Sequence, residues 1–268
     1  MPFTLSHPFA IIPLARYRLV FSALVVGSLS PDFLYFINLA PQGQFGHTVL
    51  GCFLFCLPIG MLVLWVFHAL LKWPIITLLP HALQERLVGP AHGFSFLPGA
   101  RFLLVMGSIL IGAFTHILWD SFTHEYGWAV YLLPFLNYPV IALNTKTLPL
   151  FKLLQHSSTV VGSGLILFCL IRWMNQAARE DVSQELRRSA KYKLSWSVIL
   201  IIGATIFGAV SVWWGTDGVD NPRELSLRLS RFVIGVLSGL FMELVLFSFY
   251  WQFSRATGRL AAKHVKIR

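Results

Sequence analysis

Apolar runs of about twenty residues recur along the whole chain and decide what it can fold into. They lie at residues 19–40, 48–71, 102–119, 157–171, 194–214 and 232–253. A run of this kind crosses the hydrocarbon core of a bilayer as a helix. Because 56% of the residues are hydrophobic and only 12% are charged, the chain cannot cover its apolar surface as a water-soluble globule. We expect an all-α fold, a polytopic transmembrane helical bundle of about six crossings.

Two further stretches are partly apolar but too broken to span. Residues 128–143 contain Pro134 and Pro139 among aromatic side chains, and residues 72–101 are mixed and rich in proline. Proline interrupts helices, and irregular backbone at membrane depth needs cover from protein or a water-filled cavity. We therefore expect re-entrant or interfacial helices in these two stretches.

Lysine and arginine are distributed unevenly between the two sides of this bundle. If the first crossing leaves from the side of Arg16 and Arg18, one face receives 16 of the 21 basic residues and the other receives 5. Cytoplasmic loops carry an excess of Lys and Arg. We expect both termini, including a basic tail at 254–268, to lie in the cytoplasm. The net charge of +10 then indicates orientation and attraction to anionic lipid head groups, and no nucleic-acid motif accompanies it.

The third crossing carries a polar stripe in an otherwise apolar run. His116, Asp120 and His124 recur at intervals of four within GAFTHILWDSFTHEY, residues 112–126. This spacing places the three side chains on one face of a helix, at the outer end of the crossing in the predicted topology. Two interpretations stay open: metal ligands, or an interhelical hydrogen-bond stripe that holds transmembrane helices together.

Further polar residues fall at the same level of the bilayer. Asp32 follows Pro31 in the outer part of the first crossing, and His47 and His156 begin the second and fourth crossings from outside. A carboxylate at membrane depth is costly without a partner. Asp32 could pair with an arginine, and the two histidines could simply mark helix starts. Their shared level with the stripe favours one common site.

Imidazole and carboxylate ligands together suit Zn²⁺, and also Mn²⁺ or Fe²⁺. The cysteines, Cys52, Cys56 and Cys169, lie elsewhere, which argues against a closed structural zinc site. The candidates exceed the ligands of one catalytic ion, so either two ions share the site or some residues orient the ligands. Asp120 and the adjacent Glu125 are also candidates for acid–base catalysis.

Several short motifs resemble one known family. They are SHP at 6–8, GSLSPDF at 27–33, the pair His47-Thr48, GAFTHILWDSFTH at 112–124 and LQHSSTVVG at 154–162. Together they resemble the DUF4184 family of bacterial membrane proteins. The order of the motifs more loosely resembles the predicted membrane-bound metal-dependent hydrolases of the YdjM type, and zinc-dependent phospholipase C. The resemblance implies a metal site in the bacterial inner membrane, formed by His7, Asp32, His47, His116 and Asp120, with His156 as a further member.

His7 does not fit the simplest topology. If the first crossing is a single helix that leaves from the cytoplasm, His7 lies on the opposite side from Asp32. It reaches Asp32 if residues 3–30 form a helical hairpin that enters from outside. That hairpin would place Arg16 and Arg18 at membrane depth, where a positive charge is costly.

Several functions are consistent with these residues. The leading hypothesis is a metal-dependent hydrolase that faces the outer leaflet and acts on a phosphoester, or on another lipid-like or small-molecule substrate. The alternatives are a transporter or ion- or proton-conducting protein, with Glu243 of the last crossing as a proton relay, and a non-catalytic metal-binding protein. We expect one integral-membrane domain over residues 1–268, with a metal-site half at 1–165 and accessory spans at 190–255.

Overall fold

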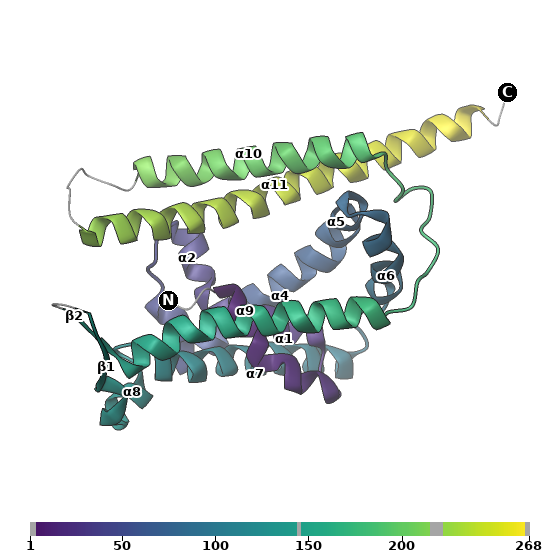
Figure 1. Cartoon of the computed structure of the whole chain (residues 1–268). Helices are drawn as coiled ribbons and strands as arrows, with labels where there is room; N and C mark the ends of the chain where they lie inside the picture. Colours follow the sequence, from purple (N-terminus) through teal and green to yellow (C-terminus); the bar gives the residue numbers. More distant parts are fainter. Residues whose placement is uncertain (1–3, 144–145, 215–221, 266–268) are drawn as a thin grey trace. The chain divides into compact units, whose positions relative to one another are not determined.

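The computed structural model describes residues 4–143, 146–214 and 222–265. Within these ranges the chain is almost entirely helical, and six helices are long and apolar enough to cross a membrane (Figure 1). They are Phe21–Asn38, Val49–Leu78, Gly99–Thr123, Leu150–Gln176, Ala190–Trp214 and Leu225–Thr257. Each overlaps one of the predicted crossings. The prediction of an all-α, multi-pass membrane protein is therefore confirmed, while residues 266–268 of the predicted basic tail lie outside the described residues.

The chain divides into two compact units. The first comprises Met1–Leu34, Gly43–Leu64 and Ser95–Gln176, and the second comprises Tyr35–Gln42, Trp65–Phe94 and Ala177–Arg268. All residues predicted to bind a metal lie in the first unit. The units do not follow the predicted halves, because residues 35–42 and 65–94 belong to the second unit although they precede residue 165.

The first unit begins with a helical hairpin. Its first arm is a 3₁₀ helix, η1 (Thr4–Arg16), and its second is α1 (Phe21–Leu29), which continues through η2 (Ser30–Asp32) into α2 (Phe33–Asn38). Pro8 and Pro13 lie inside η1, and proline removes the backbone donor that a regular α-helix needs. Arg16 and Arg18 are exposed at the turn between the arms. The hairpin therefore brings residues near the amino end to the level of Asp32.

Glycines allow α1 to approach α7 (Gly99–Thr123) closely. A Cβ atom at Gly27 would overlap the backbone of Ile109, and a Cβ atom at Gly112 would overlap the backbone of Leu24 and Ser28. Backbones approach to this distance only where a residue lacks a side chain, a common device in membrane helix packing. His116 lies one helical turn after Gly112 on α7. The close approach therefore brings the Ser28 carbonyl beside the ring of His116.

The remaining elements of the first unit surround this pair. They are η3 (Gln44–His47), α3 (Val49–Gly51), η4 (Cys52–Cys56), α4 (Leu57–Val66), α8 (Trp128–Leu132), η6 (Pro134–Asn137), β1 (Pro139–Leu143), β2 (Lys146–Pro149) and α9 (Leu150–Gln176). The antiparallel hairpin of β1 and β2 pairs Ile141 with Leu148. The expectation of a helical element throughout 128–143 is thus wrong for 139–143, where Pro139 and the β-branched Val140 and Ile141 favour a strand.

The second unit has its own apolar core. Its helices are η5 (Phe67–Leu71), α5 (Lys72–Leu78), α6 (His81–His92), α10 (Ala190–Trp214) and α11 (Pro222–Val265). Phe247 and Trp251 of α11 pack there with Leu200 of α10 and with Ile76 and Val88. Two helices, α5 and α6, thus occupy the predicted proline-rich stretch of residues 72–101.

In the same unit the carboxyl group of Glu243 lies against Gly203, in space that a Cβ atom would fill.

The close approach of α1 and α7 makes a specific stability prediction. Replacing Gly112 by Val inserts a side chain against the α1 backbone and should lower the free energy of unfolding by about 1–3 kcal/mol. Gly107 lies on the same helix with nothing within 4 Å of a built Cβ, so Gly107→Val is the matched control and should leave stability almost unchanged. Thermal unfolding of the detergent-solubilised protein measures both. Equal effects of the two substitutions would contradict the packing described.

Candidate metal centre

His116 and Asp120 stand one turn apart on α7 and form the middle of the site. His116 is 1% exposed, and its Nδ1 lies 2.7 Å from the carbonyl oxygen of Ser28. Because a carbonyl oxygen only accepts hydrogen bonds, Nδ1 carries the proton. Nε2 of the neutral ring then keeps a lone pair, and it lies 3.3 Å from Asp120 Oδ2 with no hydrogen-bond partner among the described residues.

Asp32 is buried at the end of η2, directly after Pro31. The hydroxyl of Thr4 in η1 donates a hydrogen bond of 2.7 Å to Asp32 Oδ2. The other oxygen, Oδ1, has no hydrogen-bond partner among the described residues and lies 3.7 Å from His116 Nε2. The predicted convergence of the first and third crossings is therefore found in the structure.

His47 enters the site from η3. Gly46 packs against the backbone of Pro31, which brings the next residue to Asp32. The Nδ1 atom of His47 lies 3.2 Å from the carbonyl oxygen of Gly43. Its Nε2 atom lies 3.3 Å from Asp32 Oδ1 and 3.5 Å from Asp120 Oδ2. His47 thus presents the same ring atom to both carboxylates as His116 does.

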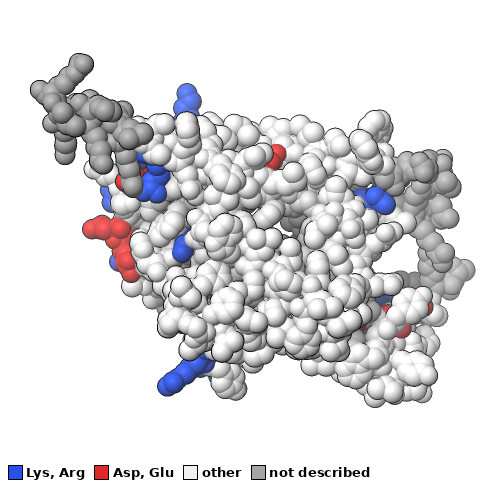
Figure 2. All heavy atoms as spheres, turned by 180° about the vertical axis from the view of Figure 1, so that it is seen from behind, with Lys and Arg blue, Asp and Glu red and all other residues white. Residues whose placement is uncertain are grey.

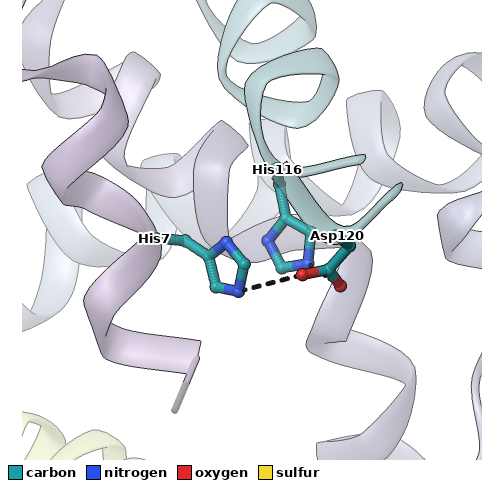
Figure 3. A group of neighbouring side chains, drawn as sticks. All are labelled: His7, His116 and Asp120. Atoms are coloured by element: carbon teal, nitrogen blue, oxygen red, sulfur yellow. Dashed lines mark ion pairs between the residues drawn. The ribbon is translucent and has the colours of Figure 1, made fainter. Parts of the chain in front are cut away.

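His7, from η1, completes the group and points toward His116 and Asp120 of α7 (Figure 3). Its ring stacks on that of His116, with ring centroids 3.7 Å apart and planes inclined by 16°. Its Nε2 lies 3.6 Å from Asp120 Oδ1. A helical hairpin is therefore observed over the described residues 4–30, and Arg16 and Arg18 are exposed at its turn.

The distances between these donor atoms are compatible with a shared cation. Nitrogen and oxygen atoms of the five residues are 3.3–3.7 Å apart, longer than ordinary hydrogen bonds between such atoms. Four ligands at about 2.0–2.2 Å from a tetrahedral Zn²⁺ are separated from one another by about 3.3–3.6 Å. The ligand atoms of His7, His116 and Asp120 lie within 4.8 Å of one another, as do those of Asp32, His47 and His116.

Both groups of possible ligands contain His116. Its Nδ1 is engaged by Ser28, so Nε2 alone is available, and one imidazole nitrogen binds one ion. Of the two possibilities left by the sequence, one ion with additional orienting residues therefore fits this geometry better than two ions that each need His116.

The site contains two carboxylates whose ion-pair partners, among the described residues, are all histidines. Among the described residues, no Lys or Arg forms an ion pair with Asp32 or Asp120. Burial lowers the pKa of His7 to about 3, and the adjacent His116 ring acts in the same direction. Burial by itself also lowers the pKa of His47, but contacts with the Asp120 and Asp32 carboxylates outweigh it and raise this pKa to about 10. A proton on His47 and a bound cation are thus alternative sources of compensating positive charge.

His124 lies beside the centre but in neither group of possible ligands. Its Nδ1 is 3.2 Å from the Asp120 carbonyl oxygen and 3.5 Å from Asp120 Oδ1. Its Nε2 is 3.2 Å from Nε2 of the buried Gln155, whose Oε1 accepts a hydrogen bond from Lys152. Burial lowers the pKa of His124 below its usual value. With both nitrogens engaged, His124 is better placed to orient Asp120 than to bind an ion.

The structure does not bring His156 or Glu125 to the centre. His156 is exposed on α9, one residue after Gln155, and consecutive residues of a helix point about 100° apart. Glu125 is exposed just beyond the end of α7. Neither belongs to a group of possible ligands within the described residues. Gln155, which the sequence did not single out, occupies the position predicted for His156.

Two other contacts support the site through groups that are not metal-binding side chains. Thr4 holds Asp32, and the Ser28 carbonyl holds His116. The amide of Gln155, within the LQHSSTVVG motif, was a signal that could have been found. A backbone carbonyl has no signal in the sequence.

Comparison with known proteins identifies one family. The family model described as "Domain of unknown function (DUF4184)" matches residues 1–249. No curated protein and no solved structure matches the chain.

The contact between Thr4 and Asp32 predicts a stability effect. Thr4→Val removes the donor and leaves a second oxygen of a buried carboxylate unpaired, so the free energy of unfolding should fall by about 1–3 kcal/mol. Thr4→Ser keeps the hydroxyl and should recover most of the loss. Thermal unfolding of the three proteins measures this difference. Equal stability of the Val and Ser variants would show that the hydroxyl does not support Asp32.

Proposed function

The chain belongs to the DUF4184 family, and we propose that it is a membrane-bound metal-dependent hydrolase. Its ion would be held by residues from η1, η2, η3 and α7, namely His7, Asp32, His47, His116 and Asp120. The observation that carries the proposal is the meeting of imidazole nitrogens and carboxylate oxygens at 3.3–3.7 Å inside an apolar unit, with no Lys or Arg paired to the carboxylates among the described residues. The likeness to hydrolases of the YdjM type remains a prediction from the order of the motifs.

The donor atoms favour zinc, with manganese or iron as alternatives. All of them are nitrogen or oxygen, and the buried Cys52 and Cys56 pack with Ala113 in a separate apolar cluster. A divalent ion held there would supply Lewis-acid activation of water and of a phosphoryl oxygen.

The residues of the site have distinct roles in this proposal. Ser28 fixes the ring of His116, and Thr4 fixes one oxygen of Asp32, so the ligand atoms are positioned before a substrate arrives. The side chains of His47 and Asp120 are 20% and 13% exposed, whereas that of His116 is fully buried. Water and substrate would therefore approach along the edge formed by His47 and Asp120.

Asp120 is the residue best placed to handle protons. Its Oδ2 faces His47 and His116, and its Oδ1 lies near His7 and His124 without a hydrogen-bond partner among the described residues. One oxygen can hold the ion while the other accepts a proton. In phosphoester hydrolysis, a water oxygen bonds to phosphorus, the ester P–O bond breaks, and the departing alkoxide takes up a proton. The exposed Glu125, a general-base candidate in the sequence, makes no contact that supports such a role.

Metal analysis tests the proposal. Protein purified without chelator should carry about one divalent ion per chain. Asp32→Ala and His116→Ala should lose it, because each removes a central ligand. His156→Ala is the matched control, since His156 belongs to the same sequence motifs but lies outside the centre, and it should retain the ion. Absence of a stoichiometric ion from the wild type would remove the basis of the proposal.

Activity separates a hydrolase from a metal-binding protein. Metal-loaded wild type should hydrolyse bis(p-nitrophenyl) phosphate or p-nitrophenyl phosphate, and Asp120→Asn should lower the rate by about 10²-fold or more. A bound ion without any turnover would instead favour the non-catalytic or transport alternatives.

The proposed location is the inner membrane, with the site toward the outer face. The positive-inside rule places the turn with Arg16 and Arg18 in the cytoplasm. Because η1 returns from that turn, His7 and Thr4 would then lie on the outer side with Asp32. This replaces the earlier inference that the amino terminus is cytoplasmic.

Accessibility to a membrane-impermeant maleimide in intact cells checks this orientation. In a Cys169→Ser background, a cysteine replacing the exposed His156 should be labelled from outside. A cysteine replacing Tyr17, which is 53% exposed at the hairpin turn, should be labelled only after the membrane is permeabilised. The reverse pattern would place the centre on the cytoplasmic side.

A further inference from the structure

An exposed aromatic surface lies directly after the third crossing. We call residues 126–141, which include α8, η6 and most of β1, the aromatic cap. Tyr126 and Tyr131 are 95% and 86% exposed, and Trp128, Phe135 and Tyr138 are also exposed. Residues 126–145 contain no Asp, Glu, Lys or Arg. A surface of this composition is too apolar to be explained by contact with water alone.

The cap is firmly packed on its inner side. Val130 and Leu136 are buried with Phe151, and Phe122 of α7 and Leu154 of α9 pack against this cluster. The side chain of Asn137 donates a hydrogen bond to the carbonyl oxygen of Val130. The outward direction of the tyrosines is therefore a consequence of a defined core and not of a loosely attached loop.

The start of the cap packs against the end of α7. The backbone N–H of Gly127 donates a hydrogen bond of 2.9 Å to the carbonyl oxygen of His124, and a Cβ atom at Gly127 would overlap the backbone of Ser121. The cap thus begins directly beside His124, whose side chain is 30% exposed.

The bilayer interface is the partner that this surface fits. Tyrosine and tryptophan combine an apolar ring with a polar group, and they concentrate where hydrocarbon meets head groups. The cap connects the end of one span, at Thr123, to the start of another, at Leu150. Leu118 and Trp119, near the end of α7, are also exposed apolar residues. Much of the molecular surface seen in Figure 2 is likewise without charged side chains, as expected for contact with lipid.

We infer that the aromatic cap lies in the head-group region of the leaflet that borders the centre, and that it delivers amphiphilic phosphoesters from the bilayer to the exposed edge of the centre at Asp120. The location of the cap stands on its own observations. The substrate class rests on the proposed function.

Fluorescence of an environment-sensitive label tests the location. In a Cys169→Ser background, the label NBD is attached to cysteine at Tyr131 in the full-length protein, in nanodiscs of phosphatidylcholine and phosphatidylglycerol. Leu118→Cys on the α7 surface is the lipid-facing control, and Ser183→Cys, at an exposed polar position of the second unit, is the water-facing control.

The label at 131 should emit at shorter wavelength than the label at 183. Lipids brominated near the head group should quench it more strongly than lipids brominated deep in the chain. Emission and quenching like those at 183 would overturn the inference. Protection from lipid quenching that disappears on dilution to monomers would show that a second copy covers the cap instead.

A comparison of two substrates tests the delivery. In the test variant, Trp128, Tyr131 and Tyr138 are all replaced by Ser. This variant should hydrolyse dioleoyl phosphatidic acid in vesicles about tenfold more slowly than wild type. Hydrolysis of monomeric, short-chain dihexanoyl phosphatidic acid and the bound metal should be unchanged. Equal loss for both lipids would contradict delivery by the cap. Failure of the wild type to hydrolyse either lipid would overturn the substrate class, while metal content and the label at 131 would still report separately on the centre and the cap.

Discussion

The burial of two carboxylates in an apolar unit is the constraint on which the first unit depends. An ionised carboxylate away from water costs several kcal/mol unless other groups compensate it. Within the described residues, Asp32 and Asp120 receive this compensation from the imidazoles of His7, His47, His116 and His124 and from the Thr4 hydroxyl, and from no Lys or Arg. A proton on His47, or the proposed divalent cation, would supply the remaining positive charge. Metal binding would therefore release protons from the site, as is usual for imidazole ligands.

This arrangement requires backbone features far from the ligand atoms. Gly27 and Gly112 let α1 and α7 approach until the Ser28 carbonyl reaches His116. The hairpin of η1 and α1 returns His7 and Thr4 to the level of Asp32, so one short segment supplies both a possible ligand and a supporting donor. Gln155 of α9 contacts His124, which lies beside Asp120. The aromatic cap begins directly after His124, and this position links the proposed entry of lipid to the centre.

Sequence reasoning predicted the spans and most of the centre for identifiable reasons. The spacing of four between His116 and Asp120 specifies one helix face, and a carboxylate after Pro31 within an apolar run needs a partner. The same reasoning failed at His156. A sequence pattern shows where α9 starts, but not which of its side chains face the neighbouring helices. In the structure Gln155 faces His124, and His156 is exposed. His7 could not be placed, since no local pattern distinguishes a hairpin from a single crossing. The strand at 139–143 was missed because its apolar residues were assigned to an interfacial helix.

X-ray absorption at the zinc edge of the purified protein tests the central claim most directly, because it reports which atoms surround the ion. Imidazole and carboxylate ligands predict a first shell of nitrogen and oxygen alone, at about 2.0–2.2 Å. Asp32→Ala should reduce the bound zinc that gives this signal. A shell that contains sulfur at about 2.3 Å would show that cysteine binds the ion instead. Protein without bound Zn, Mn or Fe would contradict the existence of the centre.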